Sequence, residues 1–200
     1  MKKRTKRLLI LAAALLLAGL WVWRVVTLNR FYRELDNSER EMYSIGDIVP
    51  YERDYIGKDT LEGYSLRVDS VEIRDWESYL AEGNYTLEGA HSRPEKLLLV
   101  TVTLFNEDNV NEEDVFWLTE LKCTGEDSVI HLNWDLVKVI NPYLEGQYLG
   151  AQVAPGSSVQ LVLPFSLWKF QLSGVWNHLD SYHMYLRMTD WPTAKSIQLQ

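Results

Sequence analysis

The sequence predicts a mainly β protein: an antiparallel β-sandwich of about seven strands, preceded by one N-terminal transmembrane helix. Three observations lead to this fold class. A basic start is followed by a long apolar run without acidic residues. From residue 63 onward, short segments of apolar and β-branched residues alternate with turn signals, and no long helical pattern lies between them. With 46% hydrophobic residues and eight Trp, the chain as a whole is also able to form a packed core.

The transmembrane helix is predicted over residues 8–28. Residues 1–7 form a basic segment, and the run Leu8–Trp23 is entirely apolar. Extended to residue 28, the helix reaches roughly 31 Å, about the thickness of the hydrocarbon core. The basic flank predicts a cytoplasmic N terminus and an extracellular C-terminal domain at the cell membrane. Ala18-Gly19-Leu20 is a poor signal-peptide cleavage site, although cleavage after Ala18 stays an alternative.

Residues 29–62 are predicted to be a stalk and leader. Residues 29–43 mix acidic and basic side chains and carry only a thin apolar stripe, so they can continue the helix with a solvated face. A dimerising coiled coil would need more heptads than this segment provides. The β-sandwich domain is therefore expected over residues 63–200.

The first strand of this domain contains a change of phase. Tyr64, Leu66 and Val68 alternate with other residues, and the alternation then shifts to Val71 and Ile73. A one-residue slip of this kind is typical of a β-bulge.

The following strands are separated by turn residues. The segment 95–106 is rich in β-branched and apolar residues and is predicted to be a central strand. Pro155-Gly156 suits a type II turn, because glycine readily adopts the positive φ that this turn requires. The remaining predicted strands lie within residues 114–123, 128–140, 157–167, 181–191 and 195–200.

Charge and cysteine content exclude several classes of function. Residues 1–33 hold eight basic residues and no acid, so the rest of the chain carries 12 basic and 28 acidic residues, a net charge of −16. Such a surface repels nucleic acid. The single Cys123 excludes an internal disulfide and a cysteine-based zinc site, and its apolar surroundings predict a buried, inert thiol.

Three segments, "GYSLRVDSVEI", "KLLLVTVTLFNED" and "QVAPGSSVQLVLPFSL", resemble the telokin-like, immunoglobulin-like extracytoplasmic domains of unknown function of Gram-positive bacteria. The matching residues are Asn106, which ends a strand, and the turn Pro155-Gly156-Ser157. The resemblance covers roughly residues 43–200 and includes the leader "YSIGDIVPYERDY". It implies an immunoglobulin-like sandwich tethered to a membrane, and it supplies no catalytic residues.

The acidic segment 106–114 raises the question of a metal site. A helix-loop-helix calcium loop needs oxygen ligands at positions 1, 3 and 5 and glycine at position 6. Counting from Asn106 puts Val110 at position 5, and counting from Asp108 puts Val110 at position 3. The segment is therefore predicted to be a turn in which Asn106 caps the strand. Weak millimolar calcium binding stays open.

No catalytic, cofactor-binding or metal-ligating residue is predicted. His178 and His183 flank Asp180, but their spacing suits neither one helix face nor one strand face. No nucleophile elbow and no phosphate-binding glycine loop is present. An acid pair for glycoside hydrolysis is not singled out by any pattern.

The connection of residues 75–95 is the predicted partner contact. It is far longer than a usual hairpin loop and carries Trp76, Tyr79 and Tyr85, side chains that are enriched at binding hot spots. The alternative is a short helix, Trp76 to Leu80, that plugs one end of the sandwich.

Together these features predict a membrane-anchored, extracytoplasmic, non-enzymatic binding or accessory module. Its expected partners are the membrane, through residues 8–28, and another envelope protein. The alternatives are a hydrolase of the cell envelope and a calcium-dependent adhesion domain. A deep pocket with paired carboxylates would favour the hydrolase.

Overall fold

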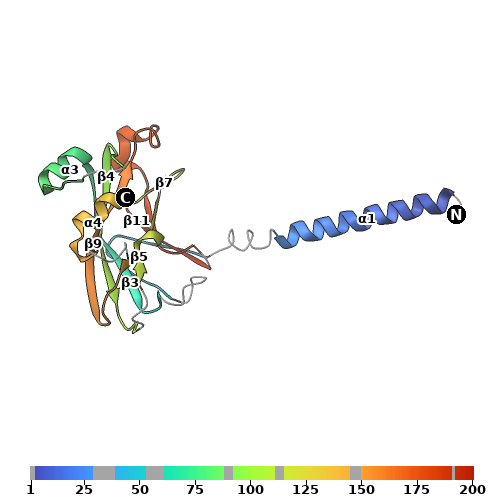
Figure 1. The fold of residues 1–200 in the computed structure, drawn as a ribbon, viewed down its shortest axis with the longest axis horizontal. Helices are drawn as coiled ribbons and strands as arrows, with labels where there is room; N and C mark the ends of the chain where they lie inside the picture. Colours follow the sequence, from blue (N-terminus) through green and yellow to red (C-terminus); the bar gives the residue numbers. More distant parts are fainter. Residues whose placement is uncertain are drawn as a thin grey trace. The chain divides into compact units, whose positions relative to one another are not determined.

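The computed structural model describes residues 3–28, 39–52, 61–87, 92–110, 115–144, 150–190 and 192–200 (Figure 1). The chain divides into two units, residues 1–38 and residues 39–200. The first unit contains the helix α1 (Lys3–Leu28). Among the described residues, no helix combines the length and the apolar character that crossing a membrane requires, so the predicted span at residues 8–28 is not confirmed.

The second unit is built mainly from two β-sheets. Sheet B has the strand order β2-β3-β4-β9, with every neighbouring pair antiparallel. Its strands are β2 (Ile48–Pro50), β3 (Tyr64–Asp75), β4 (Lys96–Asn106) and β9 (Ser157–Leu167). Sheet A has the order β1-β11-β10-β6-β7. Its strands are β1 (Glu39–Tyr43), β11 (Thr193–Gln198), β10 (Tyr185–Arg187), β6 (Lys122–Thr124) and β7 (Val129–Ile130).

Shorter elements complete this unit. The strands β5 (Phe116–Trp117) and β8 (Gly150–Ala151) form a two-stranded sheet of their own. The helices are α3 (Trp76–Gly83), α4 (Trp134–Ile140) and the 3-10 segments η2 (Leu118–Glu120), η3 (Pro142–Leu144) and η4 (Trp176–Ser181).

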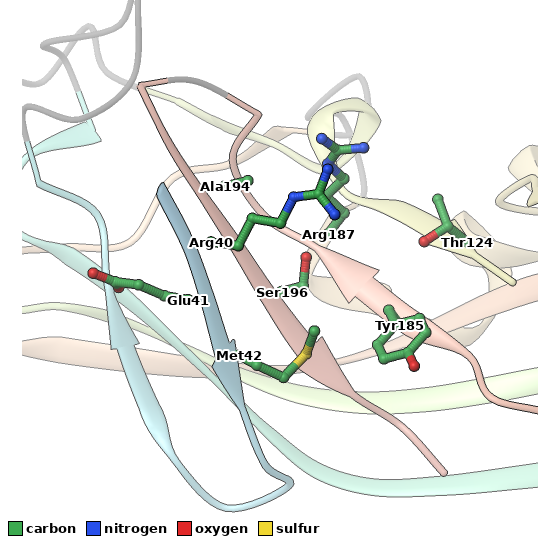
Figure 2. A pocket seen from close by; sticks show the side chains of 8 residues that line it. All are labelled: Arg40, Glu41, Met42, Thr124, Tyr185, Arg187, Ala194 and Ser196. Carbon is green, nitrogen blue, oxygen red and sulfur yellow. The ribbon is translucent and has the colours of Figure 1, made fainter. Parts of the chain in front are cut away.

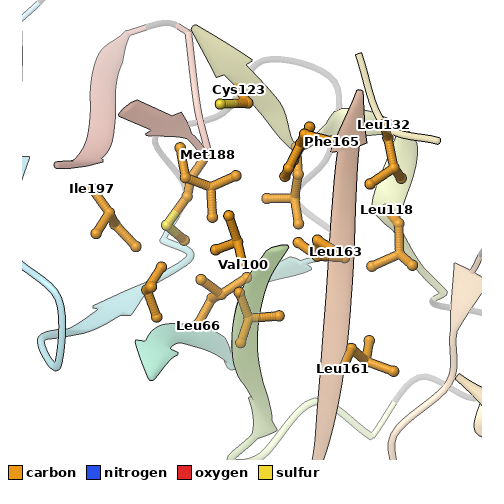
Figure 3. Close-up of a cluster of buried hydrophobic side chains, with 14 of the residues drawn as sticks. Leu66, Val100, Leu118, Cys123, Leu132, Leu161, Leu163, Phe165, Met188 and Ile197 are labelled. Carbon is orange, nitrogen blue, oxygen red and sulfur yellow. The ribbon is translucent and has the colours of Figure 1, made fainter. Parts of the chain in front are cut away.

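The main hydrophobic core combines side chains of both large sheets (Figure 3). Leu66 and Val100 come from sheet B, whereas Cys123 and Ile197 come from sheet A, and all four are buried. Cys123 is buried, as the sequence predicts, and burial raises the pKa of its thiol well above its usual range.

A second, smaller core lies on the other face of sheet B. There Trp76 of α3 and Leu136 of α4 pack with Leu97 and Leu99 of β4. Strand β4 is therefore covered on both faces near its start, which explains its nearly continuous apolar sequence. It pairs with β3 on one side and β9 on the other, so the prediction of a central strand is confirmed.

Two local predictions from the sequence are confirmed. The register of β3 against β4 shifts between Val68 and Ser70, where the change of phase predicts a bulge. Gly156 has φ +71°, and the Ser157 N–H donates to the Ala154 carbonyl at 3.0 Å, which closes the predicted turn before β9.

The strand predicted over residues 128–140 is wrong in its second half, which forms helix α4. The side chain of Asn133 accepts a hydrogen bond from the Leu136 N–H at 3.0 Å and caps the helix. The helix then places Leu136 and Val137 in the two cores. Short apolar runs do not distinguish strand from helix by themselves, because both patterns fit a few residues.

The arrangement of strands also differs from a fully antiparallel sandwich of seven. Strand β1 lies parallel to β11, and several of the strands span only two or three residues. The immunoglobulin-like topology is not confirmed. The predicted leader also contributes to the domain, because β1 and β2 pair with β11 and β3. Residues 29–38 of the predicted stalk lie outside the described residues.

Candidate functional site

The outer face of sheet A is the candidate functional site. Alternation along each strand sends one set of side chains into the core and the other set to the opposite face. Lys195, Ile197, Leu186 and Cys123 are buried on the inner side. Their neighbours in sequence form the outer face, where Met42 is 59% exposed. This contrasts with sheet B, whose outer face carries α3 and α4.

A hollow of about 360 Å³ lies on this outer face (Figure 2). The central strand β11 presents only the small side chains of Ala194 and Ser196 there, and larger side chains of the neighbouring strands stand on either side. This difference in size produces the hollow. Its lining residues are Arg40, Glu41, Met42, Thr124, Tyr185, Arg187, Ala194 and Ser196.

Two arginines lie on strands on either side of β11. Arg40 on β1 is opposite Ala194, and Arg187 on β10 is opposite Ser196, so the two lie diagonally across one intervening strand. Strands separated by one neighbour are roughly 10 Å apart. Figure 2 shows the Arg40 side chain directed across β11 toward Arg187, whereas Glu41 points the other way. The Glu41 carboxylate accepts a hydrogen bond from the Tyr43 hydroxyl at 2.5 Å.

The charges of this face do not cancel. Asp190 bridges Arg187 and Lys122, with an Nε–Oδ1 distance of 2.5 Å and an Nζ–Oδ2 distance of 2.9 Å. The single Asp190 carboxylate is thus paired with two cationic side chains. The Arg40 side chain makes no hydrogen bond or ion pair with any described residue. A local excess of positive charge therefore lies on a region of the chain that is acidic as a whole.

Three hydroxyl groups also face the hollow. The side chains of Tyr185, Ser196 and Thr124 line it and make no hydrogen bond with another described residue. Hydroxyl groups donate as well as accept hydrogen bonds. The hollow therefore offers guanidinium and hydroxyl donors to a ligand that brings acceptors.

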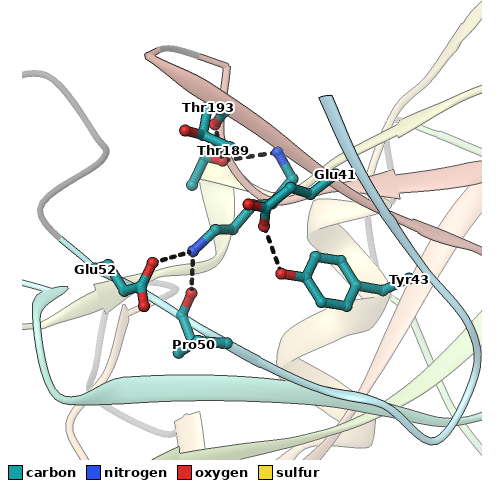
Figure 4. A network of polar contacts seen from close by, with 7 residues as sticks. Glu41, Tyr43, Pro50, Glu52, Thr189 and Thr193 are labelled. Carbon is teal, nitrogen blue, oxygen red and sulfur yellow. Dashed lines mark hydrogen bonds and ion pairs between the residues drawn. The ribbon is translucent and has the colours of Figure 1, made fainter. Parts of the chain in front are cut away.

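Beneath the hollow, a buried lysine ties β11 to β2 (Figure 4). Lys195 is 1% exposed, and its Nζ donates to the Pro50 carbonyl at 2.9 Å and to the Glu52 carboxylate at 3.1 Å. The Thr189 hydroxyl accepts from the Lys195 N–H at 2.9 Å. Because a buried cation without partners is strongly unfavourable, these contacts hold the strand that forms the floor of the hollow.

The three predicted contact residues lie away from this face, on and after α3. Asp75 caps this helix by accepting from the Ser78 N–H at 3.0 Å. Trp76 is 3% exposed and belongs to the second core, so α3 packs on the outer face of sheet B and does not plug an end of a sandwich. Tyr79 and Tyr85 are half-buried, with ring centroids 5.7 Å apart.

Tyr79 also borders a hollow of about 400 Å³ on sheet B. Burial, with a smaller contribution from Tyr85, raises the pKa of Tyr79 to about 12. Trp76 is thus unavailable to a partner in this conformation, whereas a contact through Tyr79 and Tyr85 stays a prediction.

Asn106 closes the turn at the start of the acidic segment, as the sequence predicts. Its Oδ1 accepts from the Asn109 N–H at 2.9 Å, and its Nδ2 donates to the carbonyls of Asn109 and Val153. Residues 111–114 lie outside the described residues. Among the residues that the structure does describe, no group of three or more His, Cys, Asp or Glu side chains is placed to hold a metal ion.

Sequence reasoning missed the arginine-lined hollow. Arg40 lies in the predicted stalk and Arg187 in the penultimate predicted strand, and no local motif connects them. The alternation of Arg40 and Met42 with Glu41 and Tyr43 was the available signal for strand β1.

A family model described as a domain of unknown function (DUF5028) matches residues 40–195. Among solved structures, the crystal structure of the yjhA protein from Bacillus subtilis is similar at 14% sequence identity and a TM-score of 0.44. That match covers 80% of this chain and 100% of the yjhA chain. No curated protein matches.

Proposed function

The chain belongs to the DUF5028 family of domains of unknown function, and from this premise we propose that it is a non-enzymatic binding module for another component of the cell envelope. Its binding surface in this proposal is the outer face of sheet A. The immunoglobulin-like, extracytoplasmic character that the sequence suggests is part of the same proposal.

One observation carries the proposal: the outer faces of the two large sheets differ in what covers them and in which side chains they expose. Helices α3 and α4 cover part of the outer face of sheet B, where Trp76 and Leu136 pack against β4. The outer face of sheet A instead presents the exposed Met42 beside the Arg40 guanidinium and three hydroxyl groups, none of which has a side-chain partner among the described residues. Arginine, methionine and tyrosine are enriched at protein interfaces. An open sheet face with this composition supports binding.

The proposal includes attachment to a membrane through residues 8–28. Its basis is the apolar run Leu8–Trp23 with a basic segment before it. In intact protoplasts that express the full chain, added protease is expected to digest residues 39–200 and to spare the N terminus. Survival of the domain in intact protoplasts, with digestion after lysis, would contradict this orientation. A mature N terminus near Gly19 would contradict a retained anchor.

Site-specific photocrosslinking tests the binding face. A photoreactive phenylalanine analogue is placed at Met42 or, as a control, at Val110, which is 78% exposed but outside sheet A. In intact source cells, the analogue at Met42 is expected to give discrete adducts with one envelope component. The analogue at Val110 should not give the same adducts. Identical adducts from both positions, or none from Met42, would contradict the proposed face.

The alternative of an envelope hydrolase makes a different prediction for the same hollow. A hydrolase of wall polymers needs a pair of carboxyl groups on either side of the bond to be cleaved. The carboxylates near this hollow are Glu41, which points away from Arg187, and Asp190, which bridges two cations. This geometry favours the binding module over the hydrolase.

A further inference from the structure

We infer that the hollow on the outer face of sheet A binds the phosphate group of a small, water-soluble phosphate ester. This inference rests on the proposed function and adds a second ligand, a small soluble anion, at the same surface. It is carried by the donors that converge on the hollow from four strands: Arg40 on β1, Ser196 on β11, Arg187 and Tyr185 on β10, and Thr124 on β6.

The Arg187 side chain is held in place by an ion pair with Asp190. The Arg187 Nε lies 2.5 Å from Asp190 Oδ1, and the side chain has no hydrogen bond or ion pair with any other described residue. Asp190 is fixed in turn by Lys122. A guanidinium oriented in this way keeps donors free in a defined plane, which lowers the entropic cost of binding an oxyanion.

Arg40 supplies a second guanidinium group to the hollow. Its guanidinium reaches across the small side chain of Ala194 and carries a positive charge that no described residue neutralises. Ala194 and Ser196 leave the space between the two arginines unfilled. An anion in that space would be in reach of both guanidinium groups, and both would attract it. Its negative charge would also reduce the repulsion between the two guanidinium groups.

The donor groups of the hollow favour a phosphate over a carboxylate as the ligand. A carboxylate is planar and is satisfied by one bidentate guanidinium. The hollow instead offers two guanidinium groups and three hydroxyls from several directions. Such a set matches the several acceptor oxygens of a tetrahedral phosphate better than the two oxygens of a carboxylate.

The overall charge of the domain favours a small phosphate ester over an anionic membrane surface or a polyanion. The region that follows residue 33 carries a net charge of −16, which repels an anionic bilayer or a nucleic acid as a whole. Because salt screens more distant charges, a single phosphate in the hollow interacts mainly with charges within about 8–10 Å, and the arginines lie in that range. The hydroxyls and the half-buried Tyr185 ring then face the remainder of the ester.

Calorimetric titration of the full chain in a neutral detergent tests this inference, with glycerol 3-phosphate as the probe and acetate as the carboxylate comparison. Glycerol 3-phosphate is expected to bind, and acetate to bind at least about tenfold more weakly. Arg40→Gln should weaken glycerol 3-phosphate binding by about tenfold or more. Arg93→Gln, the same loss of charge at an exposed position outside sheet A, should change it less than about twofold. Ser196→Leu fills the hollow and should abolish binding.

Unchanged binding in Arg40→Gln, or equal affinity for acetate, would overturn the inference. Because Arg40 is exposed on an edge strand, its replacement is not expected to unfold the domain, and a thermal melt of each variant verifies this. The titration is repeated in micelles that contain phosphatidylglycerol. Loss of glycerol 3-phosphate binding there would assign the hollow to a lipid headgroup instead. If the crosslinks from Met42 form while glycerol 3-phosphate fails to bind, the ligand class is wrong and the binding module stands.

Discussion

Replacing Trp76 by Ala is expected to lower the free energy of unfolding by about 3–5 kcal/mol, the usual cost of truncating a fully buried aromatic side chain. Trp76 is 3% exposed and packs with Leu97, Leu99 and Leu136, so its removal leaves a cavity between the helices and sheet B. For a domain of this size, the melting temperature should fall by roughly 6–20 °C. A thermal melt or a urea titration measures the loss.

The exposed aromatic Phe170 provides the control. It is 73% exposed, and Phe170→Ala should change the free energy of unfolding by about half a kcal/mol or less. The half-buried Tyr85 should give an intermediate loss. A loss below about 1 kcal/mol for Trp76→Ala would show that the indole is not part of the core. It would also restore Trp76 as a candidate partner contact.

Replacing Asn106 by Ala is expected to lower the free energy of unfolding by about 2–4 kcal/mol. Asn106 is 2% exposed, and its side chain makes hydrogen bonds of 2.9, 2.7 and 2.9 Å with Asn109 and Val153. The substitution leaves the buried Val153 carbonyl without this donor and frees the turn after β4. Each buried group that loses its partner costs about 1–3 kcal/mol.

Two neighbouring substitutions separate the hydrogen bonds from the acidity of the segment. Asp108 is exposed, so Asp108→Ala should change stability by about half a kcal/mol or less in a urea titration. Asn106→Asp keeps an acceptor for the Asn109 N–H but loses both donated bonds and buries a charge, so it should be at least as harmful as Asn106→Ala. Equal stability of Asn106→Ala and Asp108→Ala would contradict this account.

The stabilising contacts and the proposed binding surface lie in different parts of the domain. Trp76 and Asn106 stabilise elements around sheet B, whereas Arg40 and Arg187 line the hollow on sheet A. Substitutions that destroy the fold and substitutions that remove a ligand contact can therefore be distinguished.

Part of the fold follows from local patterns in the sequence. The change of phase after Val68, the glycine at position 156 and Asn106 at the end of an apolar strand each predicted a feature that the structure contains. These features depend on nearby residues: side chains that alternate along a strand, the positive φ that glycine tolerates, and an amide that bonds to backbone three residues away. The same local reasoning failed for residues 134–140, because a short apolar run fits a strand and a helix equally well.

By itself, the sequence determined that the chain has a β-rich domain with an acidic surface and a buried cysteine, because composition and short-range periodicity fix which side chains avoid water. Only the tertiary structure decided which strands are neighbours. The parallel pairing of β1 with β11 brings Arg40 to the same face as Arg187, and helices α3 and α4 pack on part of the outer face of sheet B. These pairings depend on contacts between distant segments, and alternation along one strand specifies its buried face without specifying its partner.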